Sequence, residues 1–415
     1  MTTIEELDDY RWLTSYEAGF WLKRAAADSG EESTLKLVAA LRRDLTPAQA
    51  HLVVEQAGLR ARGIRKFAGA SRMFFTSKSL EQATDEGLAK YKAARFPGCV
   101  PVADLCCGIG GDLLALARRG ATMGVDRDPI LALLAEANLR VLFMERDLVD
   151  VEPTLQAIAA DVESLDIRKF AAWHIDPDRR PAGRRTTRVE LHEPGPECID
   201  RMRKAVPDGA VKLAPAATLP EAWHGAAELE WLSREGECRQ LVCWFGALAG
   251  EAGKRRATMV DAQGRALRTI VGVEQEPALA PALATNLYEP DAAVLAAGLT
   301  GALAAEHKLA ALAPGIAYLT SDSLVEDRAL ACFRIEEVFP LDLRRLRQAL
   351  RARNIGRLEI KKRGVDVLPE QLRSDLRLAG EEAATLLIAP IAGRPTVMLA
   401  QRMRANAEFE TPDER

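Results

Sequence analysis

The chain has 415 residues, of which 48% are hydrophobic, so it is long and apolar enough to form two to four domains with buried cores. Its longest uncharged stretch, residues 292–305, is shorter than the roughly 18 residues of a membrane-spanning helix, and its acidic N-terminus is unlike a signal peptide, so we expect a cytoplasmic protein. Seven cysteines without a Cys-x-x-Cys pair predict no structural metal, and the net charge of −4 argues against indiscriminate binding of nucleic acid.

Residues 1–95 predict a helical N-terminal domain. The sequence Thr46-Pro47-Ala48-Gln49 is a capping box with proline in the first turn, and it predicts a helix that ends at Gly58. Residues 65–78 then interleave four cations with three phenylalanines, Phe67, Phe74 and Phe75. Cations and aromatic rings together can hold phosphates and stack bases. The same rings can instead fill a hydrophobic core, and the sequence leaves both interpretations open.

The most informative stretch is residues 102–129, which predict a strand, a glycine turn, a helix and a second strand. Val102 to Leu105 is a short apolar run, and the turn at residues 108–111 contains three glycines, which let the backbone approach a ligand closely. The second strand delivers Asp126 to its carboxyl end. In an open α/β sheet, ligands bind at that edge.

The identity of the ligand follows from what this stretch lacks and what it contains. Leu113 stands where a dinucleotide fingerprint has its third glycine, and no Gly-Lys-Ser/Thr of a P-loop is present. Asp126 is placed to accept hydrogen bonds from both hydroxyls of a ribose. Asp104 can accept the ammonium of an amino acid through a charge-assisted hydrogen bond. A ribose joined to an amino acid indicates S-adenosylmethionine, although a unit whose glycines serve only packing is the alternative.

The stretch resembles motifs I and II of class I methyltransferases, and DLCCGIGGD is similar to the form in RNA methyltransferases related to trimethylguanosine synthase. The resemblance implies a Rossmann-like domain over residues 96–248 that binds S-adenosylmethionine, with Asp161 near the adenine amino group. Apolar runs at 155–160, 171–175 and 211–214 predict its further strands, and residues 228–246 predict its closing hairpin. The implied cofactor contacts are Asp104, Cys106, Gly108, Gly110, Gly111, Asp112, Asp126, Arg127, Asp161 and Asp176.

The sequence DPDRR, residues 176–180, follows the fourth predicted strand and matches the position of motif IV. In amino-group methyltransferases this motif reads Asn/Asp-Pro-Pro-aromatic, and the resemblance implies that the first side chain and a backbone carbonyl accept hydrogen bonds from the target amine. Here the second proline and the aromatic residue are replaced. The arrangement suits a base plus a phosphate or a substrate that is not a base, while a simple polar turn is the alternative. The predicted catalytic residues are Asp176, Pro177, Asp178 and Arg179.

The C-terminal part predicts a connecting region over residues 249–330, with a strand pair and a helix, and a β-α-β-α-β domain over residues 331–405. The latter resembles the THUMP-like domain that accompanies such methyltransferases in bacterial proteins. Residues 342–363 contain nine basic residues against two acidic ones, which makes this segment the predicted site of RNA contact. The cations assigned to it are Arg351, Arg353, Lys361, Lys362 and Arg363. Residues 406–415 are a predicted disordered tail.

Taken together, these segments resemble the bacterial class I methyltransferases with a THUMP-like domain, an α/β fold with helical and α+β additions. We expect an S-adenosylmethionine-dependent methyltransferase that acts on RNA. Two alternatives stay open. The altered motif IV allows a non-catalytic RNA-binding protein that retains the cofactor pocket, and the negative net charge favours a methyltransferase for a small molecule or a protein.

Overall fold

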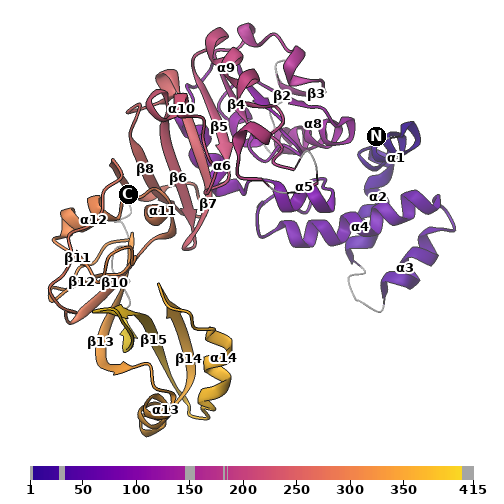
Figure 1. Ribbon diagram of the computed structural model, residues 1–415. Coiled ribbons are helices and arrows are strands. Elements are labelled where there is room, and N and C mark those ends of the chain that lie inside the picture. The colour runs from indigo at the N-terminus through magenta and orange to yellow at the C-terminus, as the bar shows by residue number, and fades with distance from the viewer. Residues whose placement is uncertain (1–2, 28–32, 145–154, 181–182, 185, 404–415) are drawn as a thin grey trace, which may run out of the picture. The chain divides into compact units, whose positions relative to one another are not determined.

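The computed structural model describes residues 3–27, 33–144, 155–180, 183–184 and 186–403 (Figure 1). The chain divides into two compact units, the first formed by residues 1–234, 239–253 and 260–266, and the second by residues 235–238, 254–259 and 267–415. The finer domain boundaries expected from the sequence stay predictions, and the expected tail at 406–415 lies outside the described residues. No helix in the described ranges is long and apolar enough to cross a membrane.

The chain begins with helices α1 (Ile4–Leu13), α2 (Tyr16–Ala27), α3 (Ser33–Leu41) and α4 (Pro47–Gly63). The predicted capping box is present, since Thr46 and Gln49 each accept a hydrogen bond from the other's backbone. The predicted end of this helix at Gly58 is wrong, because the helix continues to Gly63. An interior glycine costs only about 1 kcal/mol relative to alanine, and the buried residues Gln56 and Leu59 hold the helix on both sides of Gly58.

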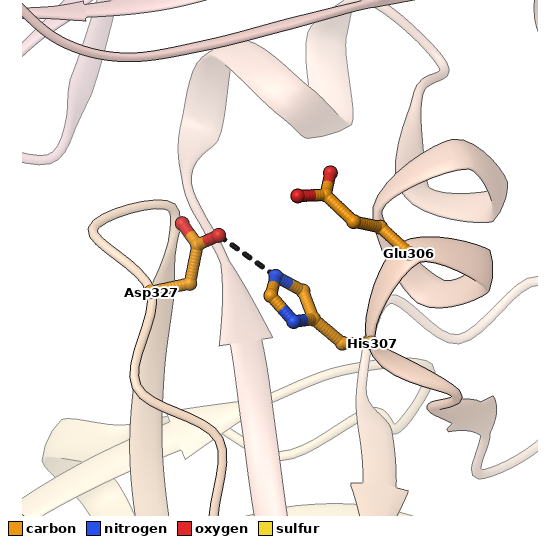
Figure 2. Close-up of side chains that lie close together, drawn as sticks. All are labelled: Glu306, His307 and Asp327. Carbon is orange, nitrogen blue, oxygen red and sulfur yellow. Dashed lines mark hydrogen bonds and ion pairs between the residues drawn. The ribbon is translucent and has the colours of Figure 1, made fainter.

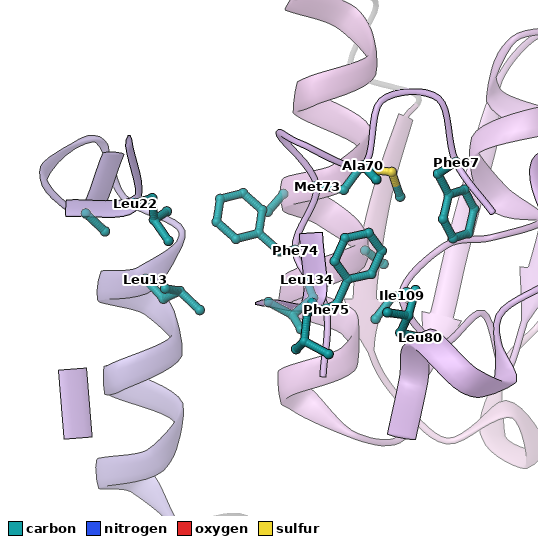
Figure 3. Close-up of a cluster of buried hydrophobic side chains, with 14 of the residues drawn as sticks. Leu13, Leu22, Phe67, Ala70, Met73, Phe74, Phe75, Leu80, Ile109 and Leu134 are labelled. Carbon is teal, nitrogen blue, oxygen red and sulfur yellow. The ribbon is translucent and has the colours of Figure 1, made fainter. Parts of the chain in front are cut away.

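The phenylalanine-rich segment precedes helices α5 (Ser77–Gln82) and α6 (Glu86–Arg95). Phe67, Phe74 and Phe75 are 3%, 9% and 1% exposed, and they lie in one apolar cluster with Leu13 of α1 and Leu134 (Figure 3). The rings of Phe67 and Phe75 are 6.0 Å apart between centroids. These three rings therefore fill a core and do not form a platform for stacking bases. The N-terminal helices share this core with the sheet domain.

The first unit is built on seven strands that follow the order β3-β2-β1-β4-β5-β7-β6 within a nine-stranded mixed sheet. The first five strands pair in parallel, and β7 runs antiparallel to β5. The strand order reverses between β1 and β4, which is the point where open α/β sheets bind ligands. The strands are β1 (Val102–Leu105), β2 (Thr122–Asp126), β3 (Leu155–Ala159), β4 (Ala172–Ile175), β5 (Gly209–Leu213), β6 (Glu228–Arg234) and β7 (Glu237–Phe245). All seven predicted strands are confirmed.

Helices connect these strands, because a parallel neighbour can be reached only by a crossover. They are α7 (Leu113–Ala117), α8 (Pro129–Met144), α9 (Pro196–Ala205) and α10 (Glu221–Ala226). Helix α8 packs against β2 and β3, and α7 packs against β1 and β2. A second apolar cluster joins α6 to the sheet through Phe96 and Trp244, whose rings are 5.9 Å apart.

The chain continues with the predicted strand pair, β8 (Arg255–Val260) and β9 (Ala266–Gly272), which are the last two strands in the order of the nine-stranded sheet. A seven-stranded sheet follows in the order β11-β12-β10-β13-β16-β15-β14. The predicted β-α-β-α-β succession is confirmed by β13 (Leu330–Pro340), α13 (Leu343–Ala352), β14 (Ile355–Lys362), α14 (Pro369–Leu376), β15 (Glu382–Ile391) and β16 (Arg394–Arg402). Helices α13 and α14 pack on β14. The remaining elements are β10 (Asn286–Pro290), α11 (Ala292–Ala296), α12 (Thr300–His307), β11 (Ala310–Ala311) and β12 (Leu319–Ser321).

Candidate active site

A cavity of about 450 Å³ lies in the first unit at the carboxyl ends of β1, β2 and β4. Its volume is within the range of small-molecule sites. Of the residues predicted as site residues, Gly110 alone does not line it. The others that the sequence singled out are brought together there: Asp104, Cys106, Gly108, Gly111, Asp112, Asp126, Arg127, Asp161, Asp176, Pro177, Asp178 and Arg179.

The glycine turn is shaped by backbone conformations and close approaches that a side chain would disturb. Gly108 and Gly110 have positive φ values of 55° and 92°, which glycine adopts at little cost. A Cβ on Gly111 would lie 2.9 Å from the carbonyl oxygen of Thr84, so only glycine fits against this residue. The turn is thereby pressed against the end of α5 and exposes its backbone to the cavity.

Asp126 is the last residue of β2, and its side chain is hydrogen-bonded to the glycine turn. Its Oδ2 accepts a hydrogen bond from the Gly108 amide at 2.8 Å, and its Oδ1 accepts one from the Asp128 amide at 2.9 Å. Each carboxylate oxygen has a second lone pair, so both can still accept a hydroxyl. Burial raises the pKa of Asp126 above its ordinary value. The geometry fits a ribose whose two hydroxyls meet this carboxylate.

Asp104 lies on β1 beside His174 of β4, because the register of the two parallel strands places these residues opposite one another. Its Oδ1 lies 2.7 Å from Nδ1 of His174. Its Oδ2 is buried and has no hydrogen-bond partner in the part of the chain that the structure describes. A buried carboxylate oxygen without a donor is costly. The residues therefore fit a ligand that carries an ammonium, as the amino-acid end of S-adenosylmethionine does.

A set of buried polar groups surrounds Asp104 and the nearby Asp112. Lys92 of α6 lies 2.7 Å from Oδ1 of Asp112 and 3.5 Å from Nε2 of His174, and Thr84 donates to Oδ2 of Asp112 at 2.7 Å. Burial alone would raise the pKa of Asp112, but the ammonium groups of Lys92 and Lys212 outweigh it and hold that pKa well below its usual range. The simplest assignment of protons has Lys92 donating to Nε2 of His174 and His174 donating to Asp104.

Asp176, directly after β4, meets a partner that the sequence did not identify. Nζ of Lys212 on β5 lies 2.5 Å from Oδ2 of Asp176. Strand register explains the contact, since Ile175 is opposite Val211 and the next pair along is Asp176 and Lys212. A single lysine inside an otherwise apolar strand is the signal that would have found it. The same reasoning applies to Lys92, which lies on the apolar face of a predicted helix.

The remaining residues of DPDRR surround the entrance to the cavity. Arg127 is 3.7 Å from Asp178 and 2.6 Å from Glu193, so its charge is held by two carboxylates. Arg179 and Arg180 line the cavity and form no ion pair with any carboxylate in the described ranges. Asp161 lines the same cavity, and its Oδ1 accepts the backbone amide of Glu163 at 2.9 Å.

A second cluster of charged groups lies in the C-terminal unit, where Glu306, His307 and Asp327 converge (Figure 2). These residue types can bind a metal ion. However, the Arg268 guanidinium is 2.5 Å from Glu306 and 3.0 Å from Asp327, and His307 is 2.8 Å from Asp327. Both carboxylates already contact Arg268, so the cluster is an ion-pair network that joins Arg268, α12 and the loop before β13.

The five cations predicted to contact RNA differ in their surroundings. Lys361 and Arg363 lie 2.6 Å and 3.1 Å from the carboxylate of Glu289, and Arg353 forms an ion pair with Glu337. Arg351 donates to a backbone carbonyl but is exposed, and Lys362 is exposed without an ion pair in the described residues. Three further exposed cations among the nine basic residues of the predicted segment, on α13 and β14, are likewise unpaired among the described residues: Arg344, Arg345 and Arg357.

Comparison with known proteins identifies the parts of the chain. Residues 330–402 match a family model described as THUMP domain-like, and residues 6–63 match a domain of unknown function. A crystal structure from Porphyromonas gingivalis W83, of a protein assigned as a methyltransferase, superposes with a TM-score of 0.73 at 20% identity and covers 90% of this chain and 99% of that chain. These matches confirm the expected fold class and the expected THUMP-like domain.

Two curated relatives are uncharacterized S-adenosylmethionine-dependent methyltransferases from Mycobacterium tuberculosis strains CDC 1551 / Oshkosh and ATCC 25618 / H37Rv. Each is 36% identical over 330 residues, which cover 78% of this chain and 86% of the relative. Similarity of this extent shows the family to which the chain belongs, and a fold whose strand order reverses at the predicted cavity agrees with it. The chain belongs to the family of S-adenosylmethionine-dependent methyltransferases, as the sequence predicted.

Proposed function

We propose that this protein transfers the methyl group of S-adenosylmethionine to RNA, with the cofactor held in the cavity at the carboxyl ends of β1, β2 and β4. The observation that carries the proposal is the orphaned Oδ2 of Asp104, which lines that cavity and needs a donor. The ammonium of the cofactor supplies one. Its ribose is then placed at Asp126, and Asp161 is placed to accept from the adenine amino group.

The residues after β4 are the proposed centre of the chemistry. The methyl sulfonium is already activated, so the protein has to align a nucleophile with it and dispose of a proton. Asp176 lies beside the switch point of the sheet, and its Oδ1 is not used by Lys212. We assign to Asp176 the orientation of the nucleophile, to the Pro177 carbonyl a second hydrogen bond, and to Asp178 and Arg179 contacts with the rest of the substrate.

RNA as the substrate is supported by the C-terminal unit. Its THUMP-like segment contains α13, on whose surface Arg344 and Arg345 are exposed and unpaired among the described residues, as are Arg357 and Lys362 of β14. Unpaired arginines and lysines are the groups that displace counterions from phosphates. Lys361 and Arg363, by contrast, are held by Glu289 and contribute less.

The test is transfer of labelled methyl groups from S-adenosylmethionine into a lysate of a host strain that lacks the gene, separated into RNA, protein and small molecules. We expect the label in RNA, so that ribonuclease but not protease removes it from the high-molecular-weight fraction. The variant Asp126→Ala, which removes the ribose contacts, should transfer little label. Label in protein or in small molecules would favour the alternative that the net charge of −4 supports, and would reject RNA as the substrate.

A further inference from the structure

Lys212 and Asp176 form an ion pair at the proposed place of methyl transfer, in which the lysine is buried and the aspartate is half-buried. The Lys212 side chain is 10% exposed and that of Asp176 is 32% exposed, so the lysine is the more deeply buried of the two partners. Asp176 lines the cavity, while Lys212 is reached through it. The contact is between neighbouring parallel strands, which fixes both backbones.

The lysine of this pair carries its charge at neutral pH. Burial by itself would lower the pKa of Lys212, but the carboxylates of Asp176 and Asp112 outweigh burial and raise the pKa above its ordinary value. The pair therefore has no net charge. An aspartate alone at this position, one of the two residue types in motif IV of amino-group methyltransferases, would have a charge of −1.

The difference in charge between the Lys212–Asp176 pair and an aspartate alone affects which atom the site can methylate. When an amine attacks a methyl sulfonium, its nitrogen becomes positively charged, and a lone carboxylate stabilises that charge. When a hydroxyl attacks, it has to lose its proton, and the oxygen becomes negative as the proton leaves. A fixed ammonium destabilises the positive charge on an attacking amine and stabilises the negative charge on an attacking hydroxyl. Both effects are strong in a buried site.

We propose that the Lys212–Asp176 pair selects an oxygen nucleophile and, because RNA offers a hydroxyl on every ribose, that the acceptor is the ribose 2′-hydroxyl. This inference rests on the proposed function, RNA methylation. The replaced motif IV agrees with it, since Asp178 and Arg179 stand where a proline and an aromatic residue would hold a target base. Arg179 and Arg180 line the cavity and are placed to meet the phosphates that flank a ribose.

The transfer step conserves atoms and electrons. A bond forms between the 2′-oxygen and the methyl carbon while the bond from that carbon to sulfur breaks, and the sulfur keeps the electron pair. The hydroxyl proton passes to Oδ1 of Asp176, the oxygen that Lys212 does not occupy, and from there to solvent. Lys212 keeps its protons throughout and compensates the negative charge of the oxygen as its proton departs.

Alkaline hydrolysis of the product distinguishes the acceptor atoms. RNA chains break in alkali only next to a free 2′-hydroxyl, so a 2′-O-methyl group leaves its label in alkali-resistant dinucleotides. The intact protein and labelled S-adenosylmethionine are incubated with total RNA from a host strain that lacks the gene. We expect the label in dinucleotides. Label in mononucleotides with a methylated base would overturn this inference and leave RNA methylation standing, and no label in any RNA would overturn both.

A set of lysine variants tests the role of the ion pair. Lys212→Met should lower the transfer rate by about 100-fold, the size expected when an active site is deprived of one electrostatic interaction, and Lys212→Arg should restore part of it. Cofactor affinity should be unchanged in both, because Asp104 and Asp126 are intact. Lys204→Met, at an exposed position of α9, is the matched control. A wild-type rate in Lys212→Met, or equal reductions of rate and cofactor affinity, would reject the assigned role.

Discussion

Charged side chains are arranged in opposite ways in the cavity of the first unit and on the surface of the C-terminal unit. In the cavity, Lys92 and Lys212 are buried and each meets an aspartate, and one oxygen of Asp104 is left for a ligand. On α13, arginines are exposed and several have no carboxylate partner among the described residues. A buried charge has to be paired because its removal from water is costly, whereas an exposed charge stays hydrated and available to bind phosphate. The paired charges in the cavity therefore suit catalysis, and the exposed arginines on α13 suit the binding of phosphate groups.

The difference between paired buried charges and exposed charges is tested most severely by removing the cationic partner of a buried aspartate. Lys92→Met leaves the buried Asp112 without its cation and should destabilise the first unit by about 3 to 5 kcal/mol. All six tryptophans lie in this unit, so urea unfolding followed by their fluorescence measures the effect. The control is Arg11→Ala, which breaks an exposed pair with Asp8 and should have no measurable effect. Equal stabilities of the two variants would show that the buried pair contributes no more than a surface pair.

The same ion pair predicts a dependence on pH. The pKa of Asp112 is lowered in the folded protein, so the stabilisation by its pair is fully present above the pKa of an unfolded aspartate, about 3.9. It disappears as the pH falls through the lower, folded value. Urea unfolding of the wild-type protein between pH 7 and pH 5 should therefore show no decrease in stability from this pair.

The second prediction separates chemistry from cofactor binding within the cavity. Asp176→Asn keeps the shape of the side chain but removes its charge and its ability to take a proton. We expect transfer to slow by about 100-fold or more, with cofactor affinity unchanged. Single-turnover transfer to RNA measures the first quantity and calorimetric titration the second. Full activity in this variant would remove Asp176 from the chemistry.

The third prediction concerns the orphaned oxygen of Asp104. Asp104→Asn preserves the volume and the neighbouring position of His174 but turns an amide toward the cofactor's ammonium. Removal of a charge-assisted hydrogen bond, about 1.5 to 3 kcal/mol, should weaken S-adenosylmethionine binding by roughly 10- to 100-fold. Burial raises the pKa of Asp104 in the wild type, so affinity should begin to fall at a higher pH than for an exposed aspartate. Equal affinities in calorimetry would place the ammonium elsewhere.

The smallest effect is expected on the C-terminal surface. The double variant Arg344→Gln/Arg345→Gln should weaken RNA binding and reduce its salt dependence by about 0.7 units of log slope for each phosphate that is no longer neutralised. Lys23→Gln/Lys36→Gln, on exposed positions of α2 and α3, removes the same charge and is the control. Filter binding at several salt concentrations measures both. If the two double variants behave alike, α13 is an ordinary solvated face.

Much of the cavity could be predicted because its parts are local in sequence. The glycine turn and the position of Asp126 at the end of an apolar strand each depend on neighbours within a few residues. The capping box at Thr46, outside the cavity, could be predicted for the same reason. The error at Gly58 has the same origin, since a local rule for ending helices was overridden by burial of Leu59 against other helices. Local signals therefore located the edge of the sheet where the cavity lies, with Asp104 and Asp126, but not the buried partners of the aspartates.

The sequence by itself determined the family, the order of the motif-bearing strands along the chain, and a set of residues that line the cavity, such as Asp104 and Asp126. Only the tertiary structure decided that Lys212 meets Asp176, that His174 and Lys92 support Asp104 and Asp112, and that Phe67, Phe74 and Phe75 are core residues. The physical reason is strand register and helix packing. These bring together groups that lie tens of residues apart, and no local pattern records which buried charge will meet which partner.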